Sequence, residues 1–209
     1  MEVGNSYVVA VTGASGAFYA TRTMAALLER GCHLELIVSD YGRRLLRDEL
    51  GETASVDKLS QYLENAYGGG VRAGTWTLHS NKDLGAKIAS GSQDCRGMVV
   101  VPCSMKTLAG IAFSLSDNLL LRAADVTLKE RRRLVVVARE TPLHLGHLRL
   151  MTQVTELGGL IMPPMPAFYH RPQSLAELID QTVNRVLDQF GIVLPEDLFK
   201  RWSGPSMTR

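Results

Sequence analysis

The chain has 209 residues, of which 45% are hydrophobic, 23 are lysine or arginine and 21 are aspartate or glutamate. This length suits one α/β domain with a substantial core, and the hydrophobic content excludes a disordered chain. A formal net charge of +2 provides no strong field for nucleic acid, and no apolar run approaches the roughly 18 residues that a membrane span needs.

The first residues and the cysteines indicate in which part of the cell the protein is found. Residues 1–5 lack the basic and apolar regions of a signal peptide. Cys32, Cys95 and Cys103 are odd in number and form no C-x-x-C pair, which favours free thiols in a reducing environment over disulfides. We therefore expect a cytoplasmic protein.

Short apolar runs bounded by turn residues predict six strands. In chain order they are residues 7–11, 34–38, 75–78, 97–101, 134–138 and 160–162. Because helical patterns separate most of these runs, the chain predicts a parallel sheet with helices on both faces.

Helical patterns fill most of the intervals between these strands. They run from residue 17 to about 30, through 43–49, near 107–114, over 118–132, near 144–157 and from 174 to about 190. Ser174 and Glu177 predict a capping box for the last helix. Residues 51–70 carry only a weak pattern, with a glycine loop at 68–70. We expect one domain, residues 1–209, whose polar tail, residues 195–209, contacts a neighbouring subunit.

The strand at residues 134–138 ends in two charged side chains, Arg139 and Glu140. In open α/β sheets, ligands bind at the carboxyl ends of the strands. Arg122 and Lys129, seven residues apart in a helical segment, place two more cations on one helix face. Cations suit a phosphate and a carboxylate suits proton transfer, so these residues predict chemistry on a phosphorylated small molecule.

Two strand-to-helix turns carry small and hydroxyl-bearing residues. The first, Gly13-Ala14-Ser15-Gly16, could hold a phosphate on its backbone N–H groups or be only a tight turn that needs glycine. In the second, Ser104 could contact the same ligand or simply cap the helix that follows. The G-x-G-x-x-G fingerprint is absent and no tyrosine lies four residues before a lysine, which disfavours a nicotinamide reductase.

Two further features have ordinary interpretations. His144 and His147 lie three apart on one predicted helix face, but no third metal ligand stands at a suitable spacing. Cys103 follows a strand and could be a nucleophile, yet a buried structural thiol is the commoner role. We expect no metal site.

Six motifs, in order along the chain, resemble those of one known family. They are Thr12-Gly13-Ala14-Ser15-Gly16-Ala17, Pro102-Cys103-Ser104-Met105-Lys106-Thr107-Leu108, Arg122-Ala123-Ala124-Asp125-Val126, Leu128-Lys129-Glu130-Arg131-Arg132, Arg139-Glu140-Thr141-Pro142 and Phe168-Tyr169-His170-Arg171-Pro172-Gln173-Ser174. From about Val8 to Trp202 the chain resembles the flavin prenyltransferases of the UbiX/Pad type, formerly described as aromatic-acid decarboxylases. The likeness is weak only between residues 51 and 76.

The resemblance implies both a fold and a reaction. The fold is a single-domain, three-layer flavodoxin-like (Rossmann-like) parallel sheet, assembled into a homo-dodecamer with active sites between subunits. The reaction is a metal-independent transfer of a dimethylallyl group from dimethylallyl phosphate to reduced FMN, first to the central-ring nitrogen and then onto the neighbouring aromatic carbon. The prenylated FMN serves a UbiD-type decarboxylase, for example in ubiquinone biosynthesis. Dimethylallyl phosphate and its pyrophosphate are not distinguished as donors by one sequence.

The resemblance also implies site residues by position. Those that match the FMN site are Gly13, Ala14, Ser15, Ser39, Ser104, Met105, Lys106, Thr107 and Arg139. Those that match the donor site are Ser90, Arg122, Lys129, Tyr169, Arg185 and Trp202. The catalytic candidates are Ser15, Glu49, Glu140 and Lys129. How Ser15, Glu49 and Glu140 divide the proton transfers among themselves is left open.

Two other functions are alternatives. One is an FMN-dependent decarboxylase that acts on a cysteine-containing substrate, which would not need the cluster of phosphate-binding cations. The other is a non-catalytic flavin carrier for a decarboxylase, in which Glu140 would be dispensable.

Overall fold

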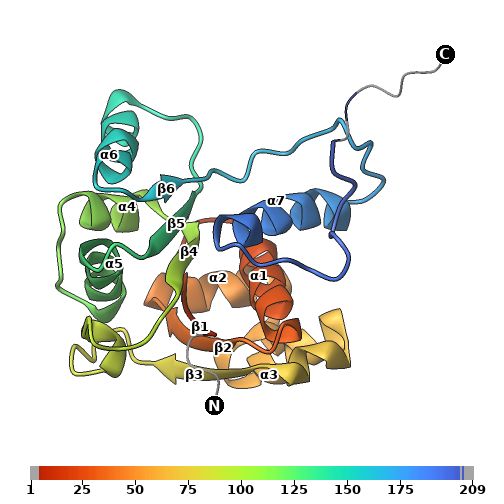
Figure 1. The fold of residues 1–209 in the computed structure, drawn as a ribbon, viewed down its shortest axis with the longest axis horizontal. Helices are drawn as coiled ribbons and strands as arrows, with labels where there is room; N and C mark the ends of the chain where they lie inside the picture. Colours follow the sequence, from red (N-terminus) through yellow and green to blue (C-terminus); the bar gives the residue numbers. More distant parts are fainter. Residues whose placement is uncertain (1–4, 203, 205–209) are drawn as a thin grey trace.

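The computed structural model describes residues 5–202 and residue 204 (Figure 1). Residues 1–4 of the start and residues 203 and 205–209 of the tail, both considered above, lie outside the described part. Within it, the chain forms one six-stranded sheet between two layers of helices. The predicted three-layer α/β architecture is confirmed.

All six strands run parallel, in the order β3-β2-β1-β4-β5-β6. Their bounds are Ser6–Val11 (β1), His33–Val38 (β2), Thr75–His79 (β3), Gly97–Cys103 (β4), Arg133–Ala138 (β5) and Leu160–Ile161 (β6). Each lies close to its predicted position. Since β1 pairs with β2 on one side and β4 on the other, the order of the chain reverses between β1 and β4.

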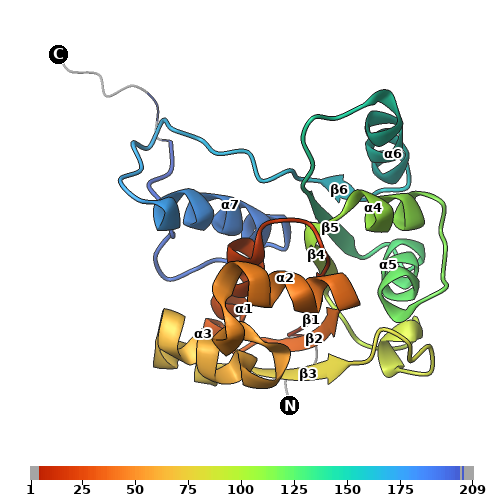
Figure 2. The ribbon, with the colours of Figure 1, turned by 180° about the vertical axis from the view of Figure 1, so that it is seen from behind.

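The helices divide between the two faces of the sheet, as Figures 1 and 2 show from opposite sides. One face carries α1 (Ala17–Glu29), α2 (Asp40–Leu50), α3 (Leu59–Tyr67) and α7 (Leu175–Gln189). The other carries α4 (Met105–Ala112), α5 (Leu119–Lys129) and α6 (Leu145–Glu156). Neighbouring strand residues enter different cores, Val9 the first and Val8 the second. Strands buried on both faces therefore read as continuous apolar runs.

The weak pattern over residues 51–70 conceals α3, which the sequence did not predict. This helix buries only Leu59 and Leu63, and two apolar contacts are too few for a clear helical period. Short 3₁₀ turns complete the connections: Glu52–Ala54 (η1), Val56–Lys58 (η2), Gly69–Ala73 (η3) and Lys87–Ala89 (η4). The expected glycine loop is thus partly a 3₁₀ turn.

The start of α7 follows the predicted capping pattern with one difference. The Ser174 side chain accepts a hydrogen bond from the Glu177 N–H at 3.2 Å, as expected of an N-cap. The Glu177 carboxylate accepts from the N–H of Gln173 at 2.9 Å, and not from that of Ser174 as a capping box requires.

Gly42 in α2 offers a test of how closely this helix approaches β1. A Cβ on Gly42 would collide with the backbone carbonyl of Val11 and lie 3.2 Å from the Ser39 hydroxyl oxygen. We expect Gly42→Ala to lower the free energy of unfolding by about 1–3 kcal/mol in urea titrations, because backbone must shift to admit the methyl group. Gly69→Ala is the matched control, since its Cβ would meet nothing within 4 Å. Equal stability of the two variants would contradict the close approach.

Candidate functional site

A cavity of about 540 Å³ opens where the order of the chain reverses, at the carboxyl ends of β1, β2 and β4. Open α/β sheets bind their ligands at this kind of position. Five residues of the predicted FMN site line the cavity: Gly13, Ser39, Ser104, Lys106 and Thr107. The predicted residues Ala14 and Ser15 continue the turn of Gly13, and Met105 is the first residue of α4. The structure therefore brings three separate turns to one ligand-sized space.

The Thr12 hydroxyl joins two of these turns. Its Oγ1 donates a hydrogen bond to the Pro102 carbonyl at 2.8 Å and accepts one from the Ser104 N–H at 2.8 Å. Thr12 is 1% exposed, so both bonds are protected from water. This side chain fixes the ends of β1 and β4 relative to each other and places Gly13 opposite Ser104.

Two serines cap the helices that begin at the cavity. Ser39 accepts a hydrogen bond from the Gly42 N–H at 3.0 Å, at the start of α2. Ser104 accepts from the Thr107 N–H at 3.3 Å and donates to the Thr107 hydroxyl at 3.1 Å, at the start of α4. The simple capping role considered for Ser104 is present. Two positive helix ends and three hydroxyls nevertheless face the same space, which suits an anion such as a phosphate.

Glu49 occupies the start of α1. Its Oε2 accepts hydrogen bonds from the N–H groups of Gly16 at 3.0 Å and Ala17 at 2.8 Å. A carboxylate from α2 thus takes the place that a phosphate could have held at this helix end. The starts of α2 and α4 remain the better position for the phosphate of a nucleotide.

Arg139 and Glu140 follow β5 at the same edge of the sheet. The Arg139 N–H donates to the Cys103 carbonyl at 3.1 Å, which holds it beside the end of β4. Its side chain is exposed and has no ion pair or hydrogen bond among the residues that the structure describes. Glu140 is also exposed, and one of its carboxylate oxygens accepts from the Thr141 N–H at 2.9 Å. Both charges are available to a ligand.

Three predicted donor-site residues gather along α5 and η4. The Arg122 Nε donates to the Ala89 carbonyl at 3.1 Å, directly before Ser90. Lys129 pairs with Glu130, and a Cβ placed on Gly91 would lie 2.7 Å from the Lys129 Nζ. Arg122, Lys129 and the turn that starts at Ser90 therefore lie together and are here called the α5 group. Arg122 also pairs with Asp125.

The other predicted donor-site residues lie around α7. Tyr169 and Trp202 contact edge to face, with ring centroids 6.0 Å apart. The Arg185 side chain donates to the Asp188 carboxylate at 2.8 Å. Asp188 is also bound by Arg201, the neighbour of Trp202. We refer to Tyr169, Arg185 and Trp202 as the α7 group.

The α5 group and the α7 group lie on opposite faces of the sheet (Figures 1 and 2). One protomer consequently does not bring the six predicted donor-site residues together. A donor that contacts both groups has to lie between protomers.

Asn81 and Asn118 also line the large cavity and were not predicted. The Asn118 side chain caps α5 by accepting from the Leu121 N–H at 3.1 Å, and the Asn81 side chain accepts from the Leu120 N–H at 2.9 Å. An asparagine before an apolar helix is a recognisable cap signal, whereas nothing in the sequence places Asn81 beside it.

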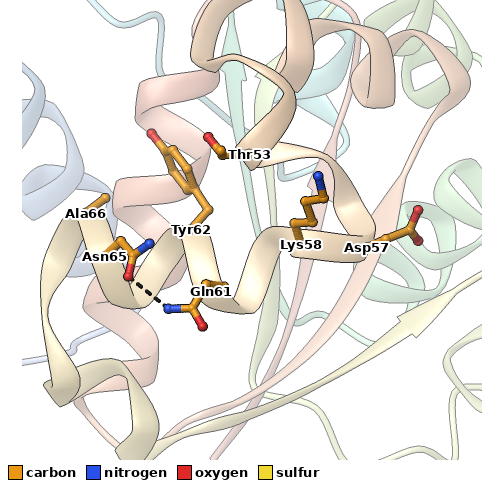
Figure 3. A pocket seen from close by; sticks show the side chains of 7 residues that line it. All are labelled: Thr53, Asp57, Lys58, Gln61, Tyr62, Asn65 and Ala66. Carbon is orange, nitrogen blue, oxygen red and sulfur yellow. Dashed lines mark hydrogen bonds between the residues drawn. The ribbon is translucent and has the colours of Figure 1, made fainter.

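A second cavity, of about 490 Å³, is lined by residues of η1, η2 and α3 (Figure 3). Polar side chains line it, including Lys58 and Gln61, and Gln61 donates to Asn65 at 2.8 Å. It contains none of the predicted site residues, so we assign it no part in the reaction.

The structure also bears on Cys103 and on the pair His144 and His147. Burial raises the pKa of the Cys103 thiol far above its usual range, which makes it a structural residue and a poor nucleophile. The rings of His144 and His147 stack with centroids 3.6 Å apart, and the His144 side chain caps α6. Among residues 5–202 and 204, no group of three metal-ligating side chains is found.

Comparisons with known proteins bear on this arrangement. The family model described as Flavoprotein matches residues 1–184. The flavin prenyltransferase UbiX of Escherichia coli (strain K12) is 52% identical over 198 residues, which cover 94% of this chain and 97% of the relative. The chain belongs to the UbiX flavin prenyltransferase family. UbiX of Thauera aromatica, 48% identical over 197 residues, covers 94% of this chain and 93% of that relative.

Solved structures of family members share the fold closely. AnUbiX (PadA1), in complex with FMN and dimethylallyl pyrophosphate, is 41% identical with a TM-score of 0.83, over 96% of this chain and 98% of that one. A dodecameric FMN-dependent UbiX-like decarboxylase from Escherichia coli O157:H7 is 38% identical with a TM-score of 0.80, over 95% and 99%. The cypemycin decarboxylase CypD, at 18% identity and a TM-score of 0.56, shares the fold alone. No helix in the described part of the chain is long and apolar enough to cross a membrane.

Ser104 and Ser174 provide a matched pair for testing the cavity. Each caps a helix, so replacing either with alanine should cost about 1 kcal/mol of stability. Only Ser104 faces the cavity, and we expect Ser104→Ala alone to weaken FMN binding, as measured by quenching of flavin fluorescence. Equal FMN affinity in the two variants would exclude Ser104 from the flavin site.

Proposed function

We propose that the protein transfers a dimethylallyl group from dimethylallyl phosphate to reduced FMN, using the residues assigned above by family resemblance. The observation that carries the proposal is the cavity at the chain reversal, where two capped helix starts and the hydroxyls of Ser39, Ser104 and Thr107 lie together. Arg139 does not line this cavity but follows the neighbouring strand β5 at the same edge of the sheet. This donor set fits FMN, whose phosphate suits the starts of α2 and α4. Family membership supports the same conclusion.

Reduced FMN is the acceptor substrate: it supplies the central-ring nitrogen and the adjacent aromatic carbon, while the donor's C–O bond breaks with its electron pair leaving on the phosphate. Guanidinium and ammonium groups from Arg122, Lys129 and Arg185 stabilise the charge that develops there, and the Tyr169 hydroxyl can donate to it. No metal is needed for this role. Removing one such donor is expected to raise the barrier by roughly 2–4 kcal/mol.

The candidates for the proton transfers are Glu140, Ser15 and Glu49. Glu140 is exposed at the sheet edge and can return a proton to the phosphate or accept one from the flavin's ring carbon. Ser15 is exposed in the turn whose backbone Glu49 holds. Because Glu49 already accepts two backbone N–H groups, we assign it chiefly to positioning that turn.

The assembly follows from the separation of the α5 and α7 groups. We infer that different subunits of a homo-oligomer contribute them to one donor site, in a dodecamer like the one described for the relative from Escherichia coli O157:H7. The outer side of α6 supports an assembly, since Leu145 and Leu148 are 60% and 47% exposed there. The tail, residues 195–209, is also expected to reach a neighbouring subunit.

The wider role is proposed from the product. Prenylated FMN would pass to a UbiD-type decarboxylase in the cytoplasm, in ubiquinone biosynthesis or a related decarboxylation of aromatic acids. No nucleic acid or membrane span enters this function.

The reaction is tested by anaerobic incubation of the protein with reduced FMN and dimethylallyl phosphate, followed by mass spectrometry of the flavin. We expect a mass gain of one dimethylallyl unit, and a parallel incubation with the pyrophosphate measures donor preference. A reaction without donor is the control. Unmodified flavin, with FMN binding confirmed, would contradict the transferase and favour the decarboxylase or carrier.

Mixed assemblies test the division of the donor site. Lys129→Ala and Arg185→Ala should each be nearly inactive, but co-assembly of the two should restore activity in about one quarter of the sites, those that receive both intact groups by random mixing. The doubly substituted subunit, assembled alone, is the control. A mixture no more active than the separate variants would place both groups in one subunit's site.

A further inference from the structure

The chain after α7 folds back over that helix and over the loop that carries Tyr169. Residues 192–202, here called the return strap, are held at several points. The Leu198 N–H donates to the side chain of Asn184 at 2.8 Å, and Asn184 is 1% exposed. The Phe199 ring is buried with its centroid 5.7 Å from that of His170. These contacts fix the strap before it reaches Arg201.

Arg201 binds the carboxylate of Asp188 with both terminal nitrogens. Its Nη1 donates to Oδ2 at 2.9 Å and its Nη2 to Oδ1 at 2.7 Å, the paired geometry in which arginine binds a carboxylate most strongly. Arg201 also donates to Asp197, from Nε at 2.6 Å and from Nη2 at 2.7 Å. The same Oδ2 of Asp188 accepts from Arg185 at 2.8 Å. Asp188 is therefore shared by two arginines.

This sharing sets the charge beside Arg185. Hydrogen bonds from Arg201 hold the pKa of both Asp188 and Asp197 below their usual values, so both carboxylates stay ionised. With Arg201 present, two arginines balance two aspartates. Without it, the group would carry one net negative charge, and Asp188 would have Arg185 as its main partner. Both changes oppose the binding of a phosphate at Arg185.

We propose that Arg201 is a positioning residue for the donor site: it neutralises Asp188, which leaves Arg185 available to the donor's phosphate, and it sets Trp202 against Tyr169. The inference rests on the proposed function, because it takes Arg185 as a phosphate ligand. A purely structural ion network is the alternative, and exposed ion pairs contribute only about 0–1 kcal/mol to stability.

The test compares Arg201→Gln with the double variant Asp188→Asn plus Arg201→Gln. We expect Arg201→Gln to raise the KM for dimethylallyl phosphate about tenfold with a smaller change in kcat, and the added Asp188→Asn to reverse most of that rise, because the repelling charge is gone. The KM of Arg201→Lys should lie between those of the wild type and Arg201→Gln, since an ammonium neutralises Asp188 without the paired geometry. Lys200→Gln removes an adjacent exposed cation and should leave KM unchanged.

Direct binding separates this inference from the proposed reaction. Calorimetry of dimethylallyl phosphate with the assembled protein holding oxidised FMN should show weaker binding by Arg201→Gln at unchanged FMN affinity. Equal donor affinity in Arg201→Gln and wild type, or no recovery in the double variant, would overturn the role of Arg201. Donor binding by the wild type without any transfer to reduced FMN would instead overturn the proposed function while leaving the Arg201 comparison intact.

Discussion

The Thr12 hydroxyl is the contact on which the site depends. Thr12 directly follows β1, and its hydroxyl donates to the Pro102 carbonyl in β4 and accepts from the Ser104 N–H just after β4. Thr12 is buried, and each of its two bonds gives a backbone group its partner. A buried backbone group that loses its hydrogen-bond partner costs the fold about 1–3 kcal/mol of stability. The turn of Gly13 and the cap of Ser104 are rigid relative to each other because this one side chain joins them. A cavity built on strand ends and helix starts is accordingly formed before any ligand arrives.

Preorganisation at the proposed flavin cavity contrasts with the proposed division of the donor site. The α5 group is supported by η4 on one face of the sheet, and the α7 group by the return strap on the other. Each cation of these groups is already paired with a carboxylate, Arg122 with Asp125, Lys129 with Glu130 and Arg185 with Asp188, so neither group alone has a net positive charge to offset a phosphate dianion. In the proposed assembly the donor would be enclosed between subunits, which would exclude water and strengthen each charge interaction. Under this proposal catalysis and oligomerisation are two consequences of the same arrangement.

Much of the fold is predictable because β1, β2, β4 and β5 are buried on both faces and carry apolar runs, broken only in β2 by Glu35. The turns that follow β1, β2 and β4 are equally visible as small and hydroxyl-bearing residues, and the turn after β5 as two charged ones. The sequence does not reveal α3, which has too few buried positions, or the capping of α1 by Glu49, which comes from another helix. The bond between Arg201 and Asp188 was also beyond prediction, since it depends on the tail turning back over α7. Family resemblance named donor-site residues, but only the three-dimensional arrangement places them on opposite faces.

A structure of the assembled protein with FMN and dimethylallyl phosphate would test the proposed flavin and donor sites most directly. We predict that the flavin lies in the cavity beside Gly13 and Ser104. The donor's phosphate should lie between the α5 group of one subunit and the α7 group of another. A phosphate bound entirely within one subunit, or bound away from both groups, would contradict the account.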